Sequence, residues 1–388
     1  MRVAYISYDR FPSPKGAATH IAAFAGALAE QFGEIDLYTV SAAAPGEPPL
    51  LAELPGVRHV PLAATGPNLI ERVLCFRAQL QAALTGRHYD VIHVRSIYEG
   101  LPIALNKQQW CRRLVVEVNG LPSIELKYHY PDVADDLELT RKLRWQEQRL
   151  LESADLVLTV SDVNAAHLVS RGVSPERIRV IPNGVDCELF AYSPPRRWPV
   201  DQVTMLYSGT MSPWQGVAQA IESVALCRRD FPAELHLVGE SRPRQRKELE
   251  RACFDWGVTD AVHFHGPVSQ SELVDLHHAA DVVLAPLRPN DRNRKQGCCP
   301  LKVLEAMASG TPLIASDLEV VRLLARHGQE ALLVRPRGGK PIKDAVLKLQ
   351  SDPHLAPQLS AAARRRAKQH FSWQLAQARL LAAYEELA

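Results

Sequence analysis

The sequence lacks any apolar run approaching the roughly 20 residues that a membrane-spanning helix needs, and its mean hydropathy is −0.14. Charge of one sign is also scarce, since 45 basic against 43 acidic residues leave a net charge of +2. That balance argues against a protein held to nucleic acid by a broad cationic face. The opening residues, MRVAYISYD, offer an apolar run too short for a secretion signal. We therefore expect a cytoplasmic protein without a nucleic-acid partner.

Several chemical signatures are missing as well. The seven cysteines are an odd number and show no Cys-x-x-Cys or Cys/His spacing, so neither a disulfide scaffold nor zinc is indicated. No G-x-x-x-x-G-K-[ST], G-x-G-x-x-G or G-x-S-x-G occurs, which disfavours P-loop NTPases, dinucleotide dehydrogenases and α/β-hydrolases. No Asp-x-Asp pair is present to hold a catalytic metal, and the 14 histidines are scattered. We expect no metal and no cofactor.

Short apolar runs alternate with helical patterns along most of the chain. The expected strands cover 2–7, 34–40, 57–61, 89–94, 113–118, 155–160, 177–181, 203–208, 234–238, 261–264, 281–285, 311–315 and 331–335. The expected helices cover 17–31, 69–84, 137–151, 163–170, 217–228, 244–256, 271–279 and 302–309. Nearly continuous Val/Ile/Leu strands between helices indicate parallel sheets covered on both faces. The fold class is therefore α/β and doubly wound.

The alternation breaks once, over residues 182–202, where four prolines occur and no periodic face is present. The sequence predicts a first Rossmann-like lobe over 1–185, a linker over 186–202 and a second Rossmann-like lobe over 203–365. A helical tail over 366–388 is expected to pack back on the first lobe. Two such lobes predict a central cleft facing the carboxyl ends of the strands, where ligands bind in these sheets.

The strongest local signal is RPNDRNRKQGCCPLKVLEAMASG at 288–310. The helix it contains begins near Pro300 and ends at Gly310, and free N–H groups in the first turn of a helix attract anions. Lys302 and Glu305 are three residues apart and share a helix face. A cation beside a phosphate, with a carboxylate one turn deeper, suits a nucleotide. A solvated basic loop followed by a surface glutamate is the simpler alternative.

Three weaker signals follow strands. The turn at 203–216, VTMLYSGTMSPWQG, places Gly209 and Gly216 where a backbone could approach a ligand. In SYDRFPSPKGAATHI at 7–21, Gly16 opens a helix and His20 lies one turn into it, although a packed helix histidine is the more common case when nothing else is known. The strand in VVEVNGLPS at 115–123 ends with Glu117, Asn119 and Gly120, which could present a hydrogen-bonding side chain to a substrate.

Taken in order, these segments resemble the family 4 glycosyltransferases, which have the GT-B fold. The resemblance rests on SPKGAATH, on LLESADLVLTVSDVNAAHLVSRGVSPERIRVIPNGVDCELF, on LYSGTMSPWQG, LHLVGE and VHFHGPVSQSELVDLHHAADVVLAP, and on PLKVLEAMASGTPLIAS. It spans nearly the whole chain. It implies a retaining, hexosyltransferase-like enzyme that uses a nucleoside diphosphate sugar without a metal.

The resemblance also implies roles for single residues. Glu305 would grip the donor ribose, Gly16 would bring backbone N–H groups to the diphosphate, and Gly266, Pro267 and Val268 would contact the base through backbone. Lys302 would neutralise the leaving group, and Asn119 with His20 would face the reacting sugar or the acceptor. The remaining expected donor contacts are Gly209, Thr210, Gln215, Arg294, Gly297, Cys298 and Cys299.

Three departures from the family pattern affect these roles. Thr210 and Gln215 stand where the family usually has Arg and Lys, so we expect Lys302, helped by Arg294 or Lys295, to restore the lost charge. Gly297 stands where an acidic residue is usual, so the backbone of 297–299 would contact the donor sugar. Asn119 replaces a histidine often found in the first lobe, and Lys15 replaces the first glycine of the opening pair.

These observations predict a glycosyltransferase that acts in polysaccharide or glycoconjugate biosynthesis, with a glycan, lipid-linked or small-molecule acceptor. Another GT-B sugar-nucleotide enzyme, such as a 2-epimerase or a phosphorylase, is an alternative. So is a catalytically degenerate partner subunit. A basic run with Trp145 at 141–149 leaves open a peripheral contact at the inner membrane face. The oligomeric state is not predicted.

Overall fold

A computed structural model describes residues 1–42 and 54–387. The chain divides into two compact units, which we call the first unit (Met1–Pro182 with Ala376–Ala388) and the second unit (Asn183–Leu375). These bounds differ from the expected ones in two respects. The stretch 186–202 belongs to the second unit, because it packs there. The last helix, α15 (Trp373–Glu385), begins in the second unit and continues in the first.

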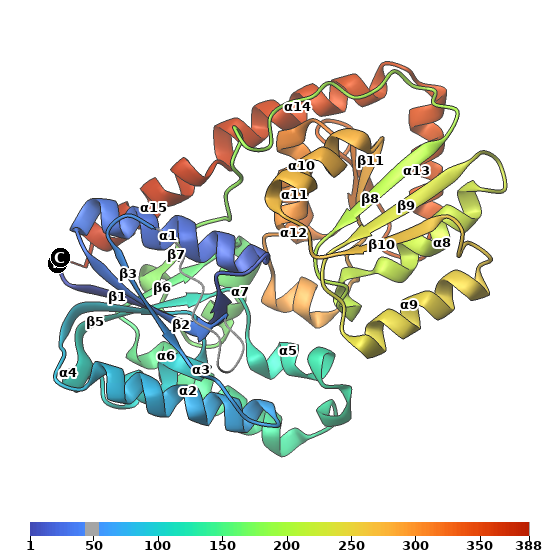
Figure 1. The fold of residues 1–388 in the computed structure, drawn as a ribbon. Coiled ribbons are helices and arrows are strands. Elements are labelled where there is room, and N and C mark those ends of the chain that lie inside the picture. The colour runs from blue at the N-terminus through green and yellow to red at the C-terminus, as the bar shows by residue number, and fades with distance from the viewer. Residues whose placement is uncertain (43–53, 388) are drawn as a thin grey trace. The chain divides into compact units, whose positions relative to one another are not determined.

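The first unit contains one parallel sheet of seven strands in the order β3-β2-β1-β4-β5-β6-β7. Its strands are β1 (Val3–Phe11), β2 (Ile35–Ser41), β3 (Val57–Leu62), β4 (Tyr89–Val94), β5 (Cys111–Val118), β6 (Leu156–Thr159) and β7 (Ile178–Val180). Helices α2 (Leu69–Leu84), α3 (Ile97–Leu105) and α6 (Leu137–Ser153) line one face, and α1 (Gly16–Phe32) and the end of α15 line the other (Figure 1). The sheet is thus covered on both faces, as its apolar strands predict.

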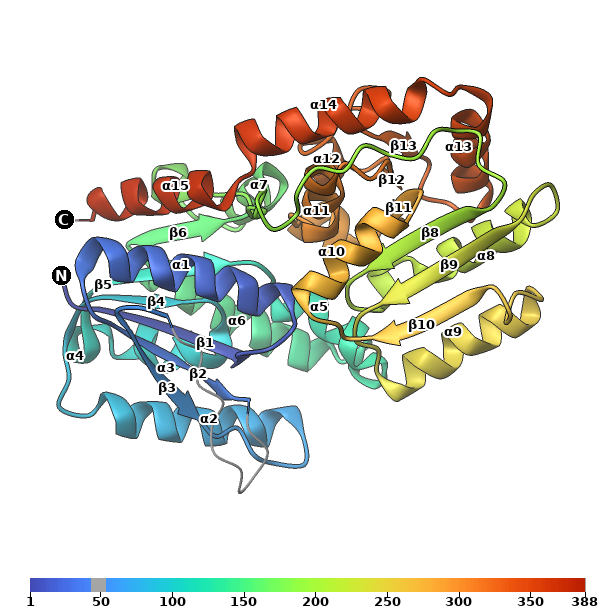
Figure 2. The ribbon, with the colours of Figure 1, turned by 45° about the horizontal axis from the view of Figure 1, so that its top comes forward.

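The second unit contains one parallel sheet of six strands in the order β10-β9-β8-β11-β12-β13. Its strands are β8 (Val203–Ser208), β9 (Ala233–Val238), β10 (Val262–Gly266), β11 (Val282–Ala285), β12 (Leu313–Ser316) and β13 (Leu332–Val334). Helices α8 (Val217–Cys227), α9 (Pro243–Asp255) and α13 (Lys340–Ser351) line one face. Helices α10 (Gln270–Ala279), α11 (Leu301–Ser309) and α14 (Leu355–His370) line the other, and β10 forms an edge of the sheet (Figure 2).

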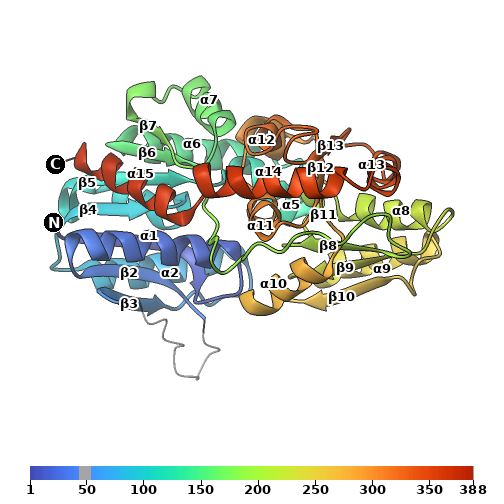
Figure 3. The same ribbon diagram turned by 90° about the horizontal axis from the view of Figure 1, so that it is seen from above.

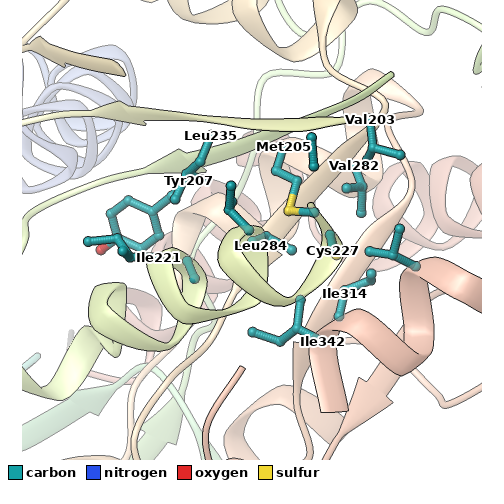
Figure 4. Packing of buried hydrophobic residues seen from close by; sticks show 14 of the residues in the cluster. Val203, Met205, Tyr207, Ile221, Cys227, Leu235, Val282, Leu284, Ile314 and Ile342 are labelled. Atoms are coloured by element: carbon teal, nitrogen blue, oxygen red, sulfur yellow. The ribbon is translucent and has the colours of Figure 1, made fainter. Parts of the chain in front are cut away.

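The core of the second unit lies between the sheet and α8. Met205 and Tyr207 of β8 alternate with residues on the other face, and they pack against Ile221 and Cys227 of α8 (Figure 4). Ile342 of α13 closes the same cluster. Because side chains in a strand alternate between faces, this packing fixes which residues of β8 and β9 point away from the core.

All the expected strands are present, with ends that shift by a few residues. Three helices of the first unit were not expected, α3, α4 (Lys107–Trp110) and α5 (Pro122–His129). The basic tract contains a short π-helical segment, Arg292–Gln296, where a plain loop was expected. The tail forms two helices, α14 and α15 (Figure 3). Within the described residues, no helix combines the length and the apolar character needed to cross a bilayer.

Candidate functional site

Lys302 lies in the first turn of α11 and is buried, with an exposed fraction of 5%. Its ammonium group donates to Gln215 Oε1 at 2.8 Å and to the Tyr207 hydroxyl at 3.3 Å, and it lies 4.4 Å from the centre of the Tyr207 ring. Burial lowers the pKa of Lys302 to about 8, and the charge of Arg292 acts in the same direction. Since both hydrogen-bond partners are neutral, the ammonium is a buried cation that favours the approach of an anion.

Glu305 lies one turn further along α11 and is partly exposed. Burial of the carboxyl group raises its pKa to about 7, while the charge of Lys302 opposes that rise. Among residues 1–42 and 54–387, none forms a hydrogen bond or ion pair with its carboxylate. A partly buried carboxylate without a partner is unusual, because native structures pair most buried polar groups. Glu305 is therefore free to accept hydrogen bonds from a ligand.

Glycines join the turns that follow β8, β9 and β10. Gly209 donates its N–H to the carbonyl of Val238, and Gly239 donates to the carbonyl of Gly266. Each of these glycines has a positive φ, of 124°, 125° and 68° respectively. A Cβ on Gly239 would lie 2.2 Å from the Gly209 carbonyl oxygen, and one on Gly209 would lie 2.9 Å from Lys302 Nζ. The turns after these three strands thus present backbone rather than side chains near Lys302.

The other expected donor contacts of the second unit lie around these turns. Thr210 is exposed, and its carbonyl accepts from the Tyr207 hydroxyl at 2.6 Å. Pro267 is exposed and Val268 is half-buried in the turn after β10. Gly216 has a φ of 74° and precedes α8, where a Cβ would lie 1.8 Å from the Pro286 carbonyl oxygen. The backbone of the turns after β8, β10 and β11 therefore determines the shape of this region.

Residues 297–299 lead into α11. Gly297 has a φ of 80°, and the Cys298 thiol donates to Asn293 Oδ1 at 3.8 Å. The Cys299 carbonyl accepts from the Asn183 side chain at 2.7 Å, and burial raises the pKa of the Cys299 thiol to about 12. Both cysteines are buried and free of disulfides. The Cys299 thiol is therefore neutral, so at this residue the backbone rather than the side chain would contact an anion.

The basic tract is placed differently from the sequence expectation in one respect. Arg294 and Lys295 are exposed, and within the described chain neither bonds to Lys302. Arg292 is the member of the tract whose charge acts on Lys302. Its guanidinium lies 5.4 Å from the centre of the Trp214 ring, which belongs to the turn before Gln215. Within the π-helical turn at 292–296, the side chains of Arg294 and Lys295 face solvent, whereas those of Asn293 and Gln296 are buried.

In the first unit, His20 and Asn119 meet at a buried carboxylate, Glu117 of β5. His20 Nε2 lies 2.9 Å from Glu117 Oε1, and the Asn119 side chain donates to the same oxygen. His20 is buried, and Asn119 is half-buried two residues beyond Glu117. Gly16 is exposed at the first position of α1, one turn before His20. The two expected first-unit side chains thus belong to one network, and Glu117 connects them.

Glu117 holds three further partners. It accepts from the Tyr5 hydroxyl at 2.9 Å, from His93 Nε2 at 3.1 Å and from Arg95 Nε at 3.2 Å. Burial opposes ionisation of Glu117, but the charges of His20 and Arg95 outweigh it and hold its pKa well below the ordinary value. Burial lowers the pKa of His93, and its Nδ1 lies 2.8 Å from the Tyr384 hydroxyl. Glu117 is therefore an ionised carboxylate that orients both histidines.

Comparison with known proteins identifies the family. Residues 14–189 match a model described as Glycosyltransferase Family 4, and residues 202–352 match one described as Glycosyl transferases group 1. The D-inositol 3-phosphate glycosyltransferase of Geodermatophilus obscurus is 31% identical, over 93% of this chain and 82% of that protein. The chain belongs to glycosyltransferase family 4.

Other members of the family and several solved structures are also similar. The MMP alpha-(1->4)-mannosyltransferase of Mycolicibacterium hassiacum is 31% identical, over 62% of this chain and 56% of that protein. The fold matches sucrose-phosphate synthase from Thermosynechococcus elongatus, with a TM-score of 0.81, 23% identity and coverage of 100% and 99% of the two chains. It also matches Anabaena HepE in complex with UDP and glucose, with a TM-score of 0.75, 18% identity and full coverage of both chains. This family 4 glycosyltransferase therefore has the GT-B fold, as the resemblance implied.

Sequence reasoning named Glu117 only as a possible hydrogen-bonding side chain, and it assigned neither His93 nor Tyr5 to the site of this glycosyltransferase. Glu117, His93 and Tyr5 are polar or ionisable residues inside strands that are otherwise nearly continuous Val, Ile and Leu. A charged residue in a strand buried on both faces requires partners, since an unpaired buried charge is costly. That signal was available for Glu117 and His93. The sequence could not identify their hydrogen-bond partners, because these come from β1, β4, α1 and α15.

Proposed function

We propose that this glycosyltransferase transfers a sugar, with retention of configuration, from a nucleoside diphosphate sugar held by the second unit. The observation that carries the proposal is the pair on α11: Lys302 is a buried ammonium with only neutral hydrogen-bond partners, and Glu305 is a carboxylate with none among the described residues. The pair offers one cation and one acceptor at the carboxyl ends of parallel strands, where such sheets bind ligands.

Each part of the donor has a complementary group. Lys302 neutralises the diphosphate, together with the N–H groups at the start of α11, and the backbone of residues 297–299 contacts the donor sugar. Glu305 accepts two hydrogen bonds from the ribose hydroxyls. The backbone of Gly266, Pro267 and Val268 contacts the base. Because Lys302 Nζ lies 2.8 Å from Gln215, the ammonium occupies the vicinity of the cationic side chain that Gln215 replaces in the family pattern.

The first unit binds the acceptor in this proposal. His20 and Asn119, both held by Glu117, face the reacting sugar or the acceptor hydroxyl, and the start of α1 at Gly16 supplies a further contact to the diphosphate. The ionised Glu117 contacts the His20 ring and fixes the orientation of the Asn119 amide. The transfer needs no metal, because cationic side chains and backbone N–H groups stabilise the leaving diphosphate.

The first experiment is calorimetry of the intact protein with UDP, GDP, ADP and dTDP. HepE is described in complex with UDP-glucose, and the relative from G. obscurus is described as a D-inositol 3-phosphate glycosyltransferase. UDP-glucose and D-inositol 3-phosphate are therefore the first donor and acceptor to assay. We expect binding of one nucleotide, turnover that persists in EDTA, and a product whose anomeric signal in NMR matches the donor. Failure to bind any nucleotide would favour a degenerate partner subunit, and epimerised free donor would favour an epimerase.

A further inference from the structure

Four ionisable side chains gather on one face of the second sheet, away from α8. Glu234 and His236 lie on β9, and His263 and His265 lie on the neighbouring edge strand β10. His236 pairs directly with His263 in the parallel register. The residue between Glu234 and His236, Leu235, belongs to the core beside α8 (Figure 4). By strand alternation, Glu234 and His236 therefore point to the opposite face.

The distances among three of these side chains match those between the ligands of a metal ion. His236 Nε2 lies 3.5 Å from Glu234 Oε1, and His263 Nε2 lies 3.6 Å from Glu234 Oε2. One nitrogen or oxygen from each of the three residues lies within 4.8 Å of the others. Ligand atoms bound about 2.0–2.1 Å from a tetrahedral zinc ion are about 3.3–3.4 Å apart. The cluster thus needs only small side-chain adjustments to accept the ion.

The outer hydrogen bonds are those that orient metal ligands. His236 Nδ1 lies 2.8 Å from His265 Nε2, so this bond fixes the His236 ring and directs Nε2 toward Glu234. The Thr204 hydroxyl donates to Glu234 Oε1 at 3.0 Å. Metal-binding histidines usually bond through their second ring nitrogen in this way. His236 Nε2 itself is buried, and its contact with Glu234 Oε1, at 3.5 Å, is longer than an ordinary hydrogen bond. A buried nitrogen that makes no ordinary hydrogen bond is a further indication that this atom binds a ligand.

We propose that Glu234, His236 and His263 form a binding site for a divalent transition-metal ion of the zinc class. Two imidazoles and one carboxylate suit zinc better than magnesium or calcium, which prefer oxygen ligands. The His263 side chain is 43% exposed, which gives the ion access from solvent and leaves its fourth position to water. The bound ion links the edge strand β10 to β9.

The three proposed ligands lie outside the residues assigned to donor binding, whereas His265, which bonds to His236, directly precedes Gly266 of the base-contacting turn. Glu234 lies four residues before the end of β9, which places it roughly 13 Å along the strand from the turns that contact the donor. The ion therefore has a structural role, and it stabilises the strand that ends at Gly266. The histidines are scattered along the sequence, but Glu-x-His at 234–236 and His-x-His at 263–265 bring their side chains to one face of adjacent strands.

The test uses the full-length protein without a histidine tag, stripped of metal and titrated with Zn²⁺ by calorimetry and with Co²⁺ by visible absorption. We expect one ion per chain and Co²⁺ bands of tetrahedral intensity. His263→Gln should weaken binding by at least about 100-fold, and His265→Gln, which removes only an outer hydrogen bond, by roughly 10–100-fold. His88→Gln, at an exposed histidine of the first unit, is the matched control and should bind as the original protein does.

Two results would overturn the proposal. One is the absence of stoichiometric Zn²⁺ binding to the original protein. The other is unchanged binding in His263→Gln, which would place the ion elsewhere, for example at the cysteine pair 298–299. Because His263 is largely exposed at the sheet edge, its replacement should not prevent folding. Thermal unfolding adds a readout independent of turnover, since Zn²⁺ should raise the Tm of the original protein but not that of His263→Gln.

Discussion

Replacement of Lys302 by methionine should stabilise the second unit and weaken donor binding at the same time. Burial lowers the pKa of Lys302 from its ordinary 10.5 to about 8. One pKa unit corresponds to 1.36 kcal/mol, so keeping the ammonium charged inside the folded protein costs about 3 kcal/mol below pH 8. Methionine keeps most of the side-chain length without this charge. A residue retained at a cost in stability is typical of a functional site.

The hydrogen bonds lost in Lys302→Met reduce the gain only in part. The Tyr207 hydroxyl still donates to the Thr210 carbonyl, and Gln215 is partly exposed and can bond to water. Glu305 loses its cationic neighbour, but its pKa is already about 7, so it can take up a proton. We expect a net gain of about 2 kcal/mol, and about 4–8 °C in the Tm of a unit of this size.

The pH dependence of this gain has a defined sign. The penalty from Lys302 is fully present below about pH 8, where both the folded and the unfolded protein carry the proton. It decreases as the pH rises from about 8 to 10.5, because the folded protein loses the proton first. Calorimetric unfolding at several pH values should therefore show the difference in Tm shrinking above pH 8. Lys295→Met, at an exposed lysine of the same basic tract, should leave the Tm nearly unchanged.

Donor binding by Lys302→Met supplies the second half of the test. Loss of one charge-assisted hydrogen bond to the diphosphate should cost about 2 kcal/mol, or roughly 30-fold in Kd. A variant that is less stable than the original protein and binds the nucleotide equally well would refute the reasoning, because Lys302 would then be a structural residue. Lys295→Met again serves as the control for nonspecific loss of positive charge.

Three further predictions concern other parts of the molecule. We expect kcat/KM to fall below about pH 7, as Glu305 takes up a proton, and above about pH 8, as Lys302 loses one. Glu305→Gln should abolish the decrease on the acid side. If that decrease is unchanged in the variant, it belongs to another group. In urea unfolding, Glu117→Gln should destabilise the first unit by at least about 3 kcal/mol, because buried Arg95 loses its carboxylate partner. The control Glu138→Gln, which breaks an exposed ion pair, should cost under about 1 kcal/mol. Equal losses of stability in the two variants would contradict the role of Glu117. Gly239→Ala should weaken donor binding and lower the free energy of unfolding by more than about 1 kcal/mol, because residue 239 has a positive φ and the new Cβ would overlap the Gly209 carbonyl oxygen. A variant with unchanged Kd and Tm would show that these turns rearrange freely.

The strands were predictable from the sequence because they are short apolar runs bounded by turns, and both sheets bury them on two faces. Helix α3 was missed because Gly100 and Pro102 interrupt its pattern, although Ser96 and Glu99 form a capping box that could have revealed it. Gly100 is required there by packing, since a Cβ would lie 2.9 Å from Leu150 of α6. Packing of this kind is not visible in the local sequence.

The site was predictable to the extent that it lies within one segment. Lys302 and Glu305 are on the same helix turn, and the basic tract next to them indicates an anion. The Glu117 network and the cluster on β9 and β10 depend on strand order and register, which no local pattern contains. The charge of Arg292, rather than that of Arg294, acts on Lys302, and this depends on a π-helical turn at 292–296 that the sequence does not signal.

The placement of α15 has a consequence for the order in which the protein is made. Tyr384 is 1% exposed in the first unit and bonds to His93, yet it is synthesised after the whole second unit. At 5–20 residues per second, the roughly 190 residues in between occupy the ribosome for on the order of 10–40 seconds. During that interval the first unit lacks the buried side chains that the end of α15 contributes to its hydrophobic core. The nascent chain must therefore wait, with His93 unpaired by Tyr384, until translation of the second unit is complete.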